Sequence, residues 1–191
     1  PFAKLARHPR MIKPVEELLG EHLYMHQFKI NGKMAFEGDV WQWHQDYGTW
    51  MNDDLMPTAR AMNVAIFLDE VTEFNGPLLF IPGSHKKGVI KASHDLTTTS
   101  YPLWVVDNET VSNLVGKNGI VSATGQRGTA VIFFDTLIHG SPGNMSPQNR
   151  AIFSLILNTV SNSYTKTGRP DYKHHRDLTP VTALADDCLL S

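Results

Sequence analysis

The 191-residue sequence predicts a mainly β fold, a double-sheet jelly roll with a few flanking helices. Three observations support this fold class. Beyond residue 20 the chain consists of short runs rich in β-branched and aromatic residues, Gly, Pro and Asn separate these runs, and helical periodicity between them is almost absent. Short strands without intervening helices favour an antiparallel sandwich or barrel over a βαβ sheet. A double-sheet jelly roll is the most economical arrangement of such strands.

The first expected element is a helix within the first twenty residues. Val15, Leu18 and Leu19 recur at helical spacing, and Gly20 is a natural helix stop. Beyond Gly20 the sequence consists of short runs of residues that favour β-strands. Eight strands are expected, at residues 22–31, 40–47, 61–70, 77–81, 121–125, 129–135, 138–140 and 151–160.

Turns and one further helix connect these strands. Asn31-Gly32 and residues 125–128 have the composition of turns. Residues 107–116 are expected to form a short helix, with Asp107 or Asn108 as its cap. No repeat, charge block or linker interrupts the chain, so we expect residues 1–191 to be one domain.

Composition excludes several classes of function. Lys and Arg total 17 against 19 Asp and Glu, a net charge of −2 that argues against nucleic acid or an anionic membrane as the main partner. No apolar run approaches the 18 residues of a membrane-spanning helix. A single cysteine, Cys188, excludes a disulfide scaffold. Because the chain opens on Pro1, we expect that an N-terminal segment is missing, and we expect a cytoplasmic protein.

The expected strand at residues 40–47 carries the first candidate metal ligands. On a strand, His44 and Asp46 would point to the same face with Cα atoms roughly 7 Å apart. His139, which follows a very apolar run, is the best candidate for a third ligand. Two histidines and one carboxylate form the facial triad of non-haem Fe(II) oxygenases. The alternative is a strand histidine that is hydrogen-bonded to an aspartate without a metal.

A second candidate group lies just beyond His139. Arg150 opens the apolar strand at residues 151–160, where an uncompensated buried charge is expensive. The planar guanidinium group fits a carboxylate bidentately, so a dicarboxylate cosubstrate would explain it. The alternative is an internal salt bridge to an Asp or Glu. Ser141 shares the face of His139 and could add a hydroxyl group, or it could be an ordinary turn residue.

These residues resemble a known family, the Fe(II)/2-oxoglutarate dioxygenases of the phytanoyl-CoA hydroxylase type, and among them the ectoine hydroxylases most. The resemblance covers roughly residues 22–175 in colinear order. It implies a double-stranded β-helix, or cupin-like, fold. The segments that carry it are Trp43-His-Gln-Asp-Tyr-Gly-Thr-Trp50, Met56-Pro-Thr-Ala-Arg60, Asn75-Gly-Pro-Leu-Leu-Phe-Ile-Pro-Gly-Ser-His85 and His139-Gly-Ser-Pro-Gly-Asn-Met-Ser-Pro147.

The resemblance implies a role for each candidate residue. His44, Asp46 and His139 would be iron ligands and the catalytic centre. The groups expected to contact 2-oxoglutarate are Arg150 and Ser141 at its distal carboxylate, together with Lys33, Asn31 and Trp41. A lysine after Asn31-Gly32 could equally be a solvated turn residue.

The substrate-binding positions are less uniform. Gln27 matches a family residue that hydrogen-bonds the substrate, and Trp50 matches one that packs over it. From the residues alone, the face of Gln27 could line a site or point outward, and Trp50 could belong to the core. Ile152 stands where the family often has a substrate-contacting Asn, and Gly48-Thr-Trp-Met51 replaces the usual Glu-Thr-Trp-His. These departures leave the metal and cosubstrate residues intact, but they argue against ectoine as the substrate.

The resemblance implies an enzyme that binds Fe(II), 2-oxoglutarate and O2. It would hydroxylate a small polar metabolite, ectoine or an amino-acid-like compound, and release succinate and CO2. An alternative is tailoring of a larger or carrier-bound natural product, which the changed residues would favour. A third is a non-catalytic jelly-roll binding domain, for which a broken triad would be expected. The expected partner is a small molecule, neither nucleic acid nor membrane, and a homodimer is compatible with the sequence.

Overall fold

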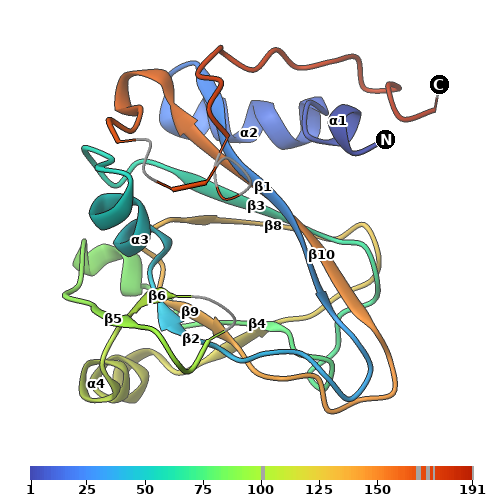
Figure 1. Cartoon of the computed structure of the whole chain (residues 1–191). Helices are drawn as coiled ribbons and strands as arrows, with labels where there is room; N and C mark the ends of the chain where they lie inside the picture. The colour runs from blue at the N-terminus through green and yellow to red at the C-terminus, as the bar shows by residue number, and fades with distance from the viewer. Residues whose placement is uncertain (100–101, 167–168, 171–172, 174, 191) are drawn as a thin grey trace.

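The computed structural model describes residues 1–99, 102–166, 169–170, 173 and 175–190, which form two facing β-sheets with helices outside them (Figure 1). The described strands are β1 (Leu23–Lys33), β2 (Trp41–His44), β3 (Met62–Phe67), β4 (Leu78–Phe80), β5 (Ser93–Asp95), β6 (Leu103–Val105), β7 (Val121–Ala123), β8 (Ala130–Phe134), β9 (His139–Ser141) and β10 (Arg150–Thr159). The helices are α1 (Phe2–Leu5), α2 (Pro9–Leu19), α3 (Asp46–Asp53) and α4 (Asn108–Asn118), with 3-10 turns η1 (Ser84–Lys87) and η2 (Val160–Asn162).

Strand order confirms the predicted double-sheet architecture. The first sheet runs β1-β10-β3-β8 and the second runs β5-β6-β2-β9-β4-β7. Every ladder between these strands is antiparallel. Consecutive strands repeatedly fall in opposite sheets, so that β1 and β3 lie in the first sheet while β2 and β4 lie in the second. Residues far apart in the sequence therefore face one another across the gap between the sheets.

The outer face of the first sheet is covered by α2 (Figure 1). Ile12 and Val15 of this helix are fully buried against alternate residues of β10, among them Leu155. The helix ends as predicted at Gly20, whose φ of 68° is the left-handed conformation that glycine adopts without strain. Because strand side chains alternate, the neighbours of these β10 residues point to the inner face.

The second sheet is covered on its outer side by α4 (Figure 1). Asp107 caps this helix, since its carboxylate accepts a hydrogen bond from the Thr110 backbone N–H at 2.8 Å, as predicted. Val111 and Leu114 are buried in a cluster that also contains Trp43 of β2. The helices thus support both sheets from outside and leave the space between the sheets open to polar residues.

One predicted strand is wrong in a way that matters for the site. Residues 40–47 were expected to form a single strand, but β2 ends at His44 and α3 begins at Asp46. Tyr47 and Trp50 are both buried, and their packing at helical spacing stabilises a turn that Gly48 would not favour by propensity. An acidic residue in the first turn also interacts favourably with the helix dipole. Asp46 therefore reaches the site from a helix N-terminus.

Other differences are local. Asn31-Gly32 is not a turn, because β1 continues to Lys33 and the two residues pair with β10. The short strands β5 and β6, of three residues each, were not predicted. The predicted turn at residues 125–128 is confirmed by the Thr129 N–H, which donates to the Gln126 carbonyl oxygen at 3.0 Å. In the described part of the chain, no helix is both long and apolar enough to cross a membrane.

Candidate metal and cosubstrate site

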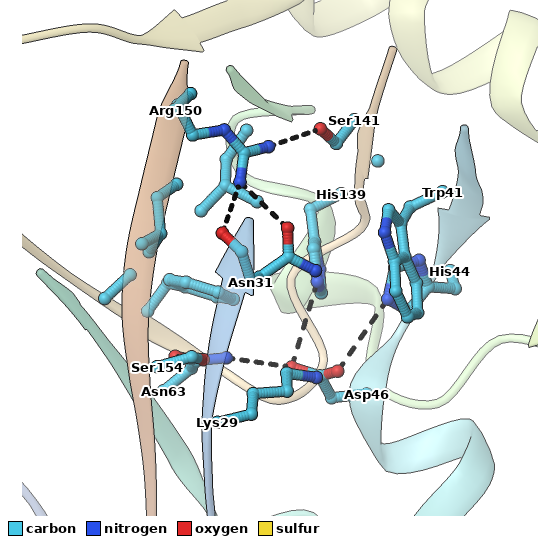
Figure 2. Close-up of a pocket in the computed structure, with 15 residues that line it drawn as sticks. Lys29, Asn31, Trp41, His44, Asp46, Asn63, His139, Ser141, Arg150 and Ser154 are labelled. Carbon is cyan, nitrogen blue, oxygen red and sulfur yellow. Dashed lines mark hydrogen bonds and ion pairs between the residues drawn. The ribbon is translucent and has the colours of Figure 1, made fainter. Parts of the chain in front are cut away.

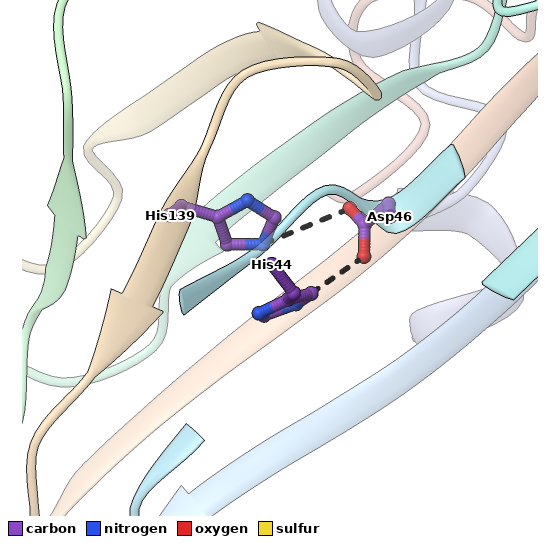
Figure 3. Close-up of side chains that lie close together, drawn as sticks. All are labelled: His44, Asp46 and His139. Carbon is purple, nitrogen blue, oxygen red and sulfur yellow. Dashed lines mark ion pairs between the residues drawn. The ribbon is translucent and has the colours of Figure 1, made fainter. Parts of the chain in front are cut away.

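Three candidate ligands meet in the space between the sheets (Figure 3). The Nε2 atom of His44 lies 3.7 Å from Asp46 Oδ1, and the Nε2 atom of His139 lies 3.8 Å from Asp46 Oδ2. His44 and His139 face each other directly in the β2–β9 ladder, with ring centroids 4.2 Å apart. All three side chains offer a ligand atom within 4.8 Å of one another. The structure therefore brings together the three residues that the sequence nominated.

Backbone carbonyls orient both imidazoles. His44 Nδ1 lies 2.7 Å from the Gln42 carbonyl oxygen, and His139 Nδ1 lies 2.9 Å from the Leu137 carbonyl oxygen. Because a carbonyl can only accept, each Nδ1 must carry a proton, and each Nε2 atom faces Asp46. This is the tautomer that a histidine needs for metal binding through Nε2.

Electrostatics favours the protonation states that bind a metal. Burial, together with the neighbouring His139, lowers the pKa of His44 to about 3, so its imidazole is neutral at pH 7. Burial alone would raise the pKa of Asp46, but His139, His44 and Lys29 outweigh it and hold that pKa below its usual value. A neutral imidazole beside an ionised carboxylate is the form in which these groups coordinate a cation.

Arg150 stands at the other end of the same space and is 1% exposed. Its guanidinium group donates to Asn31 Oδ1 at 2.8 Å and to Ser141 Oγ at 3.1 Å (Figure 2). Its Nε also donates to the Gly76 carbonyl oxygen at 2.9 Å. Burial lowers its pKa to about 10, so it remains a cation at pH 7. No Asp or Glu in the described residues lies within ion-pair distance of it, so the predicted alternative of an internal salt bridge is wrong.

Lys33 is buried but does not line this space. It is 2% exposed, which rules out the solvated-turn alternative, and its Nζ donates to the carbonyl oxygens of Asp39 at 2.8 Å and of Pro142. Burial and the nearby Arg150 lower its pKa to about 7. A Cβ atom at Gly76, where φ is +79°, would lie 2.7 Å from Lys33 Cδ, so glycine is required there. At pH 7 Lys33 is therefore a partly protonated amine that is buried close to the Arg150 cation.

A cavity between the sheets connects the triad to Arg150 (Figure 2). Trp41 and His44 both line it because the β2–β9 register is irregular between them. Ser141 lies in β9 and is 4% exposed, so it is a wall residue of the cavity and not a turn residue. The residues that line the cavity are Lys29, Asn31, Trp41, His44, Asp46, Asn63, Ala65, Leu78, Phe133, His139, Gly140, Ser141, Arg150, Ile152 and Ser154.

Three polar cavity residues escaped the sequence analysis, namely Lys29, Asn63 and Ser154. Lys29 shares the face of Asn31 on β1, so strand alternation was the signal that could have found it. Its Nζ lies 5.5 Å from the centroid of the Trp41 ring, a cation–π geometry. Asn63 and Ser154 sit within very apolar runs, where a single polar residue is the available signal.

Two predicted substrate residues are not among those that line the cavity. Gln27 is 8% exposed and shares the β1 face of Lys29, one step further from Arg150. Trp50 is 3% exposed and packs with Tyr47, and its ring meets that of His26 at 5.1 Å between centroids. Both lie on the α3 side of the metal residues, so their predicted contact with substrate remains a prediction.

The sequence matches the family model for phytanoyl-CoA dioxygenase (PhyH) over residues 2–152. It is 40% identical to L-proline trans-4-hydroxylase of Streptomyces griseoviridis, over 98% of this chain and 74% of that protein. It is 39% identical to an ectoine dioxygenase of Sphingopyxis alaskensis, over 86% of this chain and 56% of that protein.

Solved structures of similar proteins agree with the fold described above. The chain superposes on EctD from S. alaskensis with bound Fe at a TM-score of 0.82 and 34% identity, covering 96% of this chain and 63% of that one. The same protein with 2-oxoglutarate and 5-hydroxyectoine gives a TM-score of 0.82 at 36% identity, covering 96% of this chain and 62% of that one.

Proposed function

Because the chain belongs to the phytanoyl-CoA dioxygenase family, we propose that the whole protein is an Fe(II)- and 2-oxoglutarate-dependent hydroxylase of a small polar metabolite. The family predicted from the sequence is confirmed. The activity is proposed for the whole protein because the chain spans between 56% and 74% of the length of these two relatives. One observation carries the proposal: a single cavity holds a His-Asp-His triad at one end and a buried, carboxylate-free arginine at the other.

The triad fits iron. His44, Asp46 and His139 supply two imidazoles and one carboxylate, which is the donor set of the facial-triad oxygenases. When bound, Fe(II) would supply the activation of O2 and the oxidation of a C–H bond. The chain's own part is to hold the metal, place the cosubstrate and substrate, and keep water out with the apolar walls around the cavity.

Arg150 fits the distal carboxylate of 2-oxoglutarate. Its guanidinium group is buried and positively charged, and Ser141 and Asn31 hold it from two sheets. Lys33 adds a second buried basic group behind the cavity wall, and a bound dianion would favour its protonated form. Trp41 would form the wall beside the cosubstrate.

The substrate end favours a small carboxylate-bearing compound. Lys29 lines the cavity next to the triad, and the cosubstrate contacts proposed above do not use it. The relatives are named for proline and ectoine, which both carry a carboxylate, and Lys29 is placed to receive such a group. Gln27 and Trp50 would extend this end, while Ile152 presents an apolar surface. A cytoplasmic location and a homodimer remain predictions.

Substrate-triggered succinate release tests this function. The full-length protein would be incubated with Fe(II), O2 and 2-oxoglutarate against a panel of cyclic amino acids, with L-proline and ectoine first. We expect iron-dependent succinate formation, equimolar with a hydroxylated product for at least one carboxylate-bearing compound. Arg150→Gln should raise the KM for 2-oxoglutarate while Fe(II) binding stays intact.

Two outcomes would contradict the proposal. The first is an Fe(II)-loaded protein that does not bind 2-oxoglutarate in an anaerobic equilibrium titration. The second is an Arg150→Gln variant that binds 2-oxoglutarate as tightly as the wild type does. If succinate forms only with substrates that have no carboxylate group, the proposed reaction type stands and the proposed role of Lys29 is wrong.

A further inference from the structure

A polar chain runs from the first sheet to the carboxylate of Asp46 (Figure 2). Ser154 Oγ on β10 donates to Asn63 Oδ1 on β3 at 2.9 Å. Asn63 Nδ2 in turn donates to Asp46 Oδ2 at 3.5 Å. Both Asn63 and Ser154 are 6% exposed and line the cavity. The chain is therefore built into the inner face of the sheet, next to the metal residues.

The hydrogen bonds fix which way the Asn63 amide points. With its oxygen toward the Ser154 hydroxyl, its NH2 group faces the ionised Asp46 and the contact is attractive. The opposite orientation would place a carbonyl oxygen against a carboxylate oxygen, which is repulsive. The carboxylate of Asp46, which can only accept, therefore selects this orientation, and the Ser154 hydroxyl supports it by donating to Asn63 Oδ1.

Asp46 differs from the two candidate histidine ligands in what orients its side chain. His44 and His139 both come from the second sheet and are oriented by carbonyls of their own strands and loops. Asp46 comes from the first turn of α3, after the strand has ended. In the described residues, Asn63 is the side chain that gives Asp46 a hydrogen bond, so it connects the first sheet to the triad.

We propose that Asn63, supported by Ser154, is a positioning residue that fixes the rotation of the Asp46 carboxylate and would leave Oδ1 as the oxygen for a metal. This rests on the proposed function of the triad. An N–H group on Oδ2 engages a lone pair of that oxygen, so it disfavours coordination through both oxygens. A carboxylate bound through one oxygen keeps three metal positions open, which the cosubstrate and O2 require.

Metal binding tests the proposal without relying on turnover. Fe(II) would be titrated anaerobically into wild type, Asn63→Ala, Ser154→Ala and Ser154→Thr, and the Co(II)-substituted forms compared by visible absorption, which reports coordination number. Loss of a group that orients a ligand typically costs about 10- to 100-fold in metal affinity. We expect a loss in this range and an altered Co(II) spectrum for Asn63→Ala, a smaller loss for Ser154→Ala, and recovery in Ser154→Thr, which keeps the hydroxyl group.

Asn158→Ala is the matched control. Asn158 is a fully buried amide on the same strand as Ser154 and donates to the Tyr24 hydroxyl at 3.0 Å, away from the triad. It should lower stability and leave both metal affinity and the Co(II) spectrum unchanged. Wild-type affinity and spectrum in a folded Asn63→Ala variant would overturn the positioning role. Failure of the wild type to bind Fe(II) would instead overturn the proposed function.

Discussion

The two ends of helix α3 carry two carboxylates, the partly buried Asp46 and the fully buried Asp54, that meet histidines in different ways. Asp46 opens the helix between His44 and His139 and faces the cavity. Asp54 caps the other end, where its Oδ2 atom lies 3.6 Å from His26 Nε2 and its carboxylate accepts two hydrogen bonds from Arg169. Asp54 follows Asp46 by eight positions, which is a helical rise of about 12 Å. A contact between an aspartate and a histidine thus occurs at both ends of this helix.

The Asp46 cluster, with His44 and His139, and the Asp54 cluster, with His26 and Arg169, differ in their charged partners. Arg169 neutralises Asp54 directly, and the backbone carbonyl of Asp54 also accepts the Lys166 N–H at 3.0 Å. Within the described residues, Asp46 has no Lys or Arg at ion-pair distance. A buried carboxylate that is already paired with an arginine is a structural group, whereas one that faces two imidazoles and an amide is set up for a cation.

Asp46→Ala should have the largest effect on activity. It removes one of three metal ligands while leaving the helix that carries it, because Tyr47 and Trp50 still pack in the core. Iron-dependent succinate formation should fall below detection, and the far-UV circular dichroism spectrum should match that of wild type. Normal turnover in this variant would contradict the assignment of Asp46.

Asp54→Ala should have the largest effect on stability. It leaves Arg169 and His26 without their carboxylate, and breaking a buried ion pair from one side costs about 3–5 kcal/mol. Urea unfolding would measure this loss. Because Asp46 is about 12 Å away, Fe(II) affinity of the folded variant should change by no more than about twofold. A loss of metal binding as large as that of Asp46→Ala would show that the two clusters act as one.

Asp135 provides a third case, a buried carboxyl with neither an arginine nor a pair of histidines. It is fully buried, and its Oδ2 atom accepts the Ala61 N–H at 3.0 Å. Burial raises its pKa from 3.8 to about 8, so the native protein holds a proton that the unfolded chain releases above about pH 4. The resulting stabilisation is complete below pH 4 and is lost as the pH rises through 8.

Asp135→Asn should therefore flatten the pH dependence of stability. The free energy of unfolding of wild type, relative to the variant, should fall with rising pH by up to about 1.4 kcal/mol per pH unit between roughly pH 4 and pH 8. Chemical unfolding at pH 6 and pH 8 measures this difference. Parallel pH profiles for the two proteins would mean that Asp135 is ionised in the native state.

The sequence predicted the sheets and the triad because both depend on regular patterns. Apolar alternation located most strands, and His44, Asp46 and His139 could be nominated from the spacing of metal-ligand residue types. It did not predict that Asp46 begins a helix, since the burial of Trp50, a tertiary effect, overrides the weak local propensity around Gly48.

Other site residues were missed for reasons of the same kind. Lys29 and Asn63 carry no motif, and the pairing of β1, β10 and β3 places both of them along the cavity that holds the triad. Lys33 was expected at the cosubstrate, but the paths of the surrounding loops direct its ammonium group to backbone carbonyls. The place of a side chain that depends on how strands pair could not be derived from the spacing of residues along the sequence.

An anaerobic titration of Fe(II) in the presence of 2-oxoglutarate tests the central claim most directly. It would be carried out on wild type, Asp46→Ala and Asp54→Ala, with bound iron measured per folded chain. The account predicts one equivalent of Fe(II) bound by wild type and by Asp54→Ala, and none retained by Asp46→Ala. Stoichiometric binding to Asp46→Ala, or no binding to wild type, would contradict it.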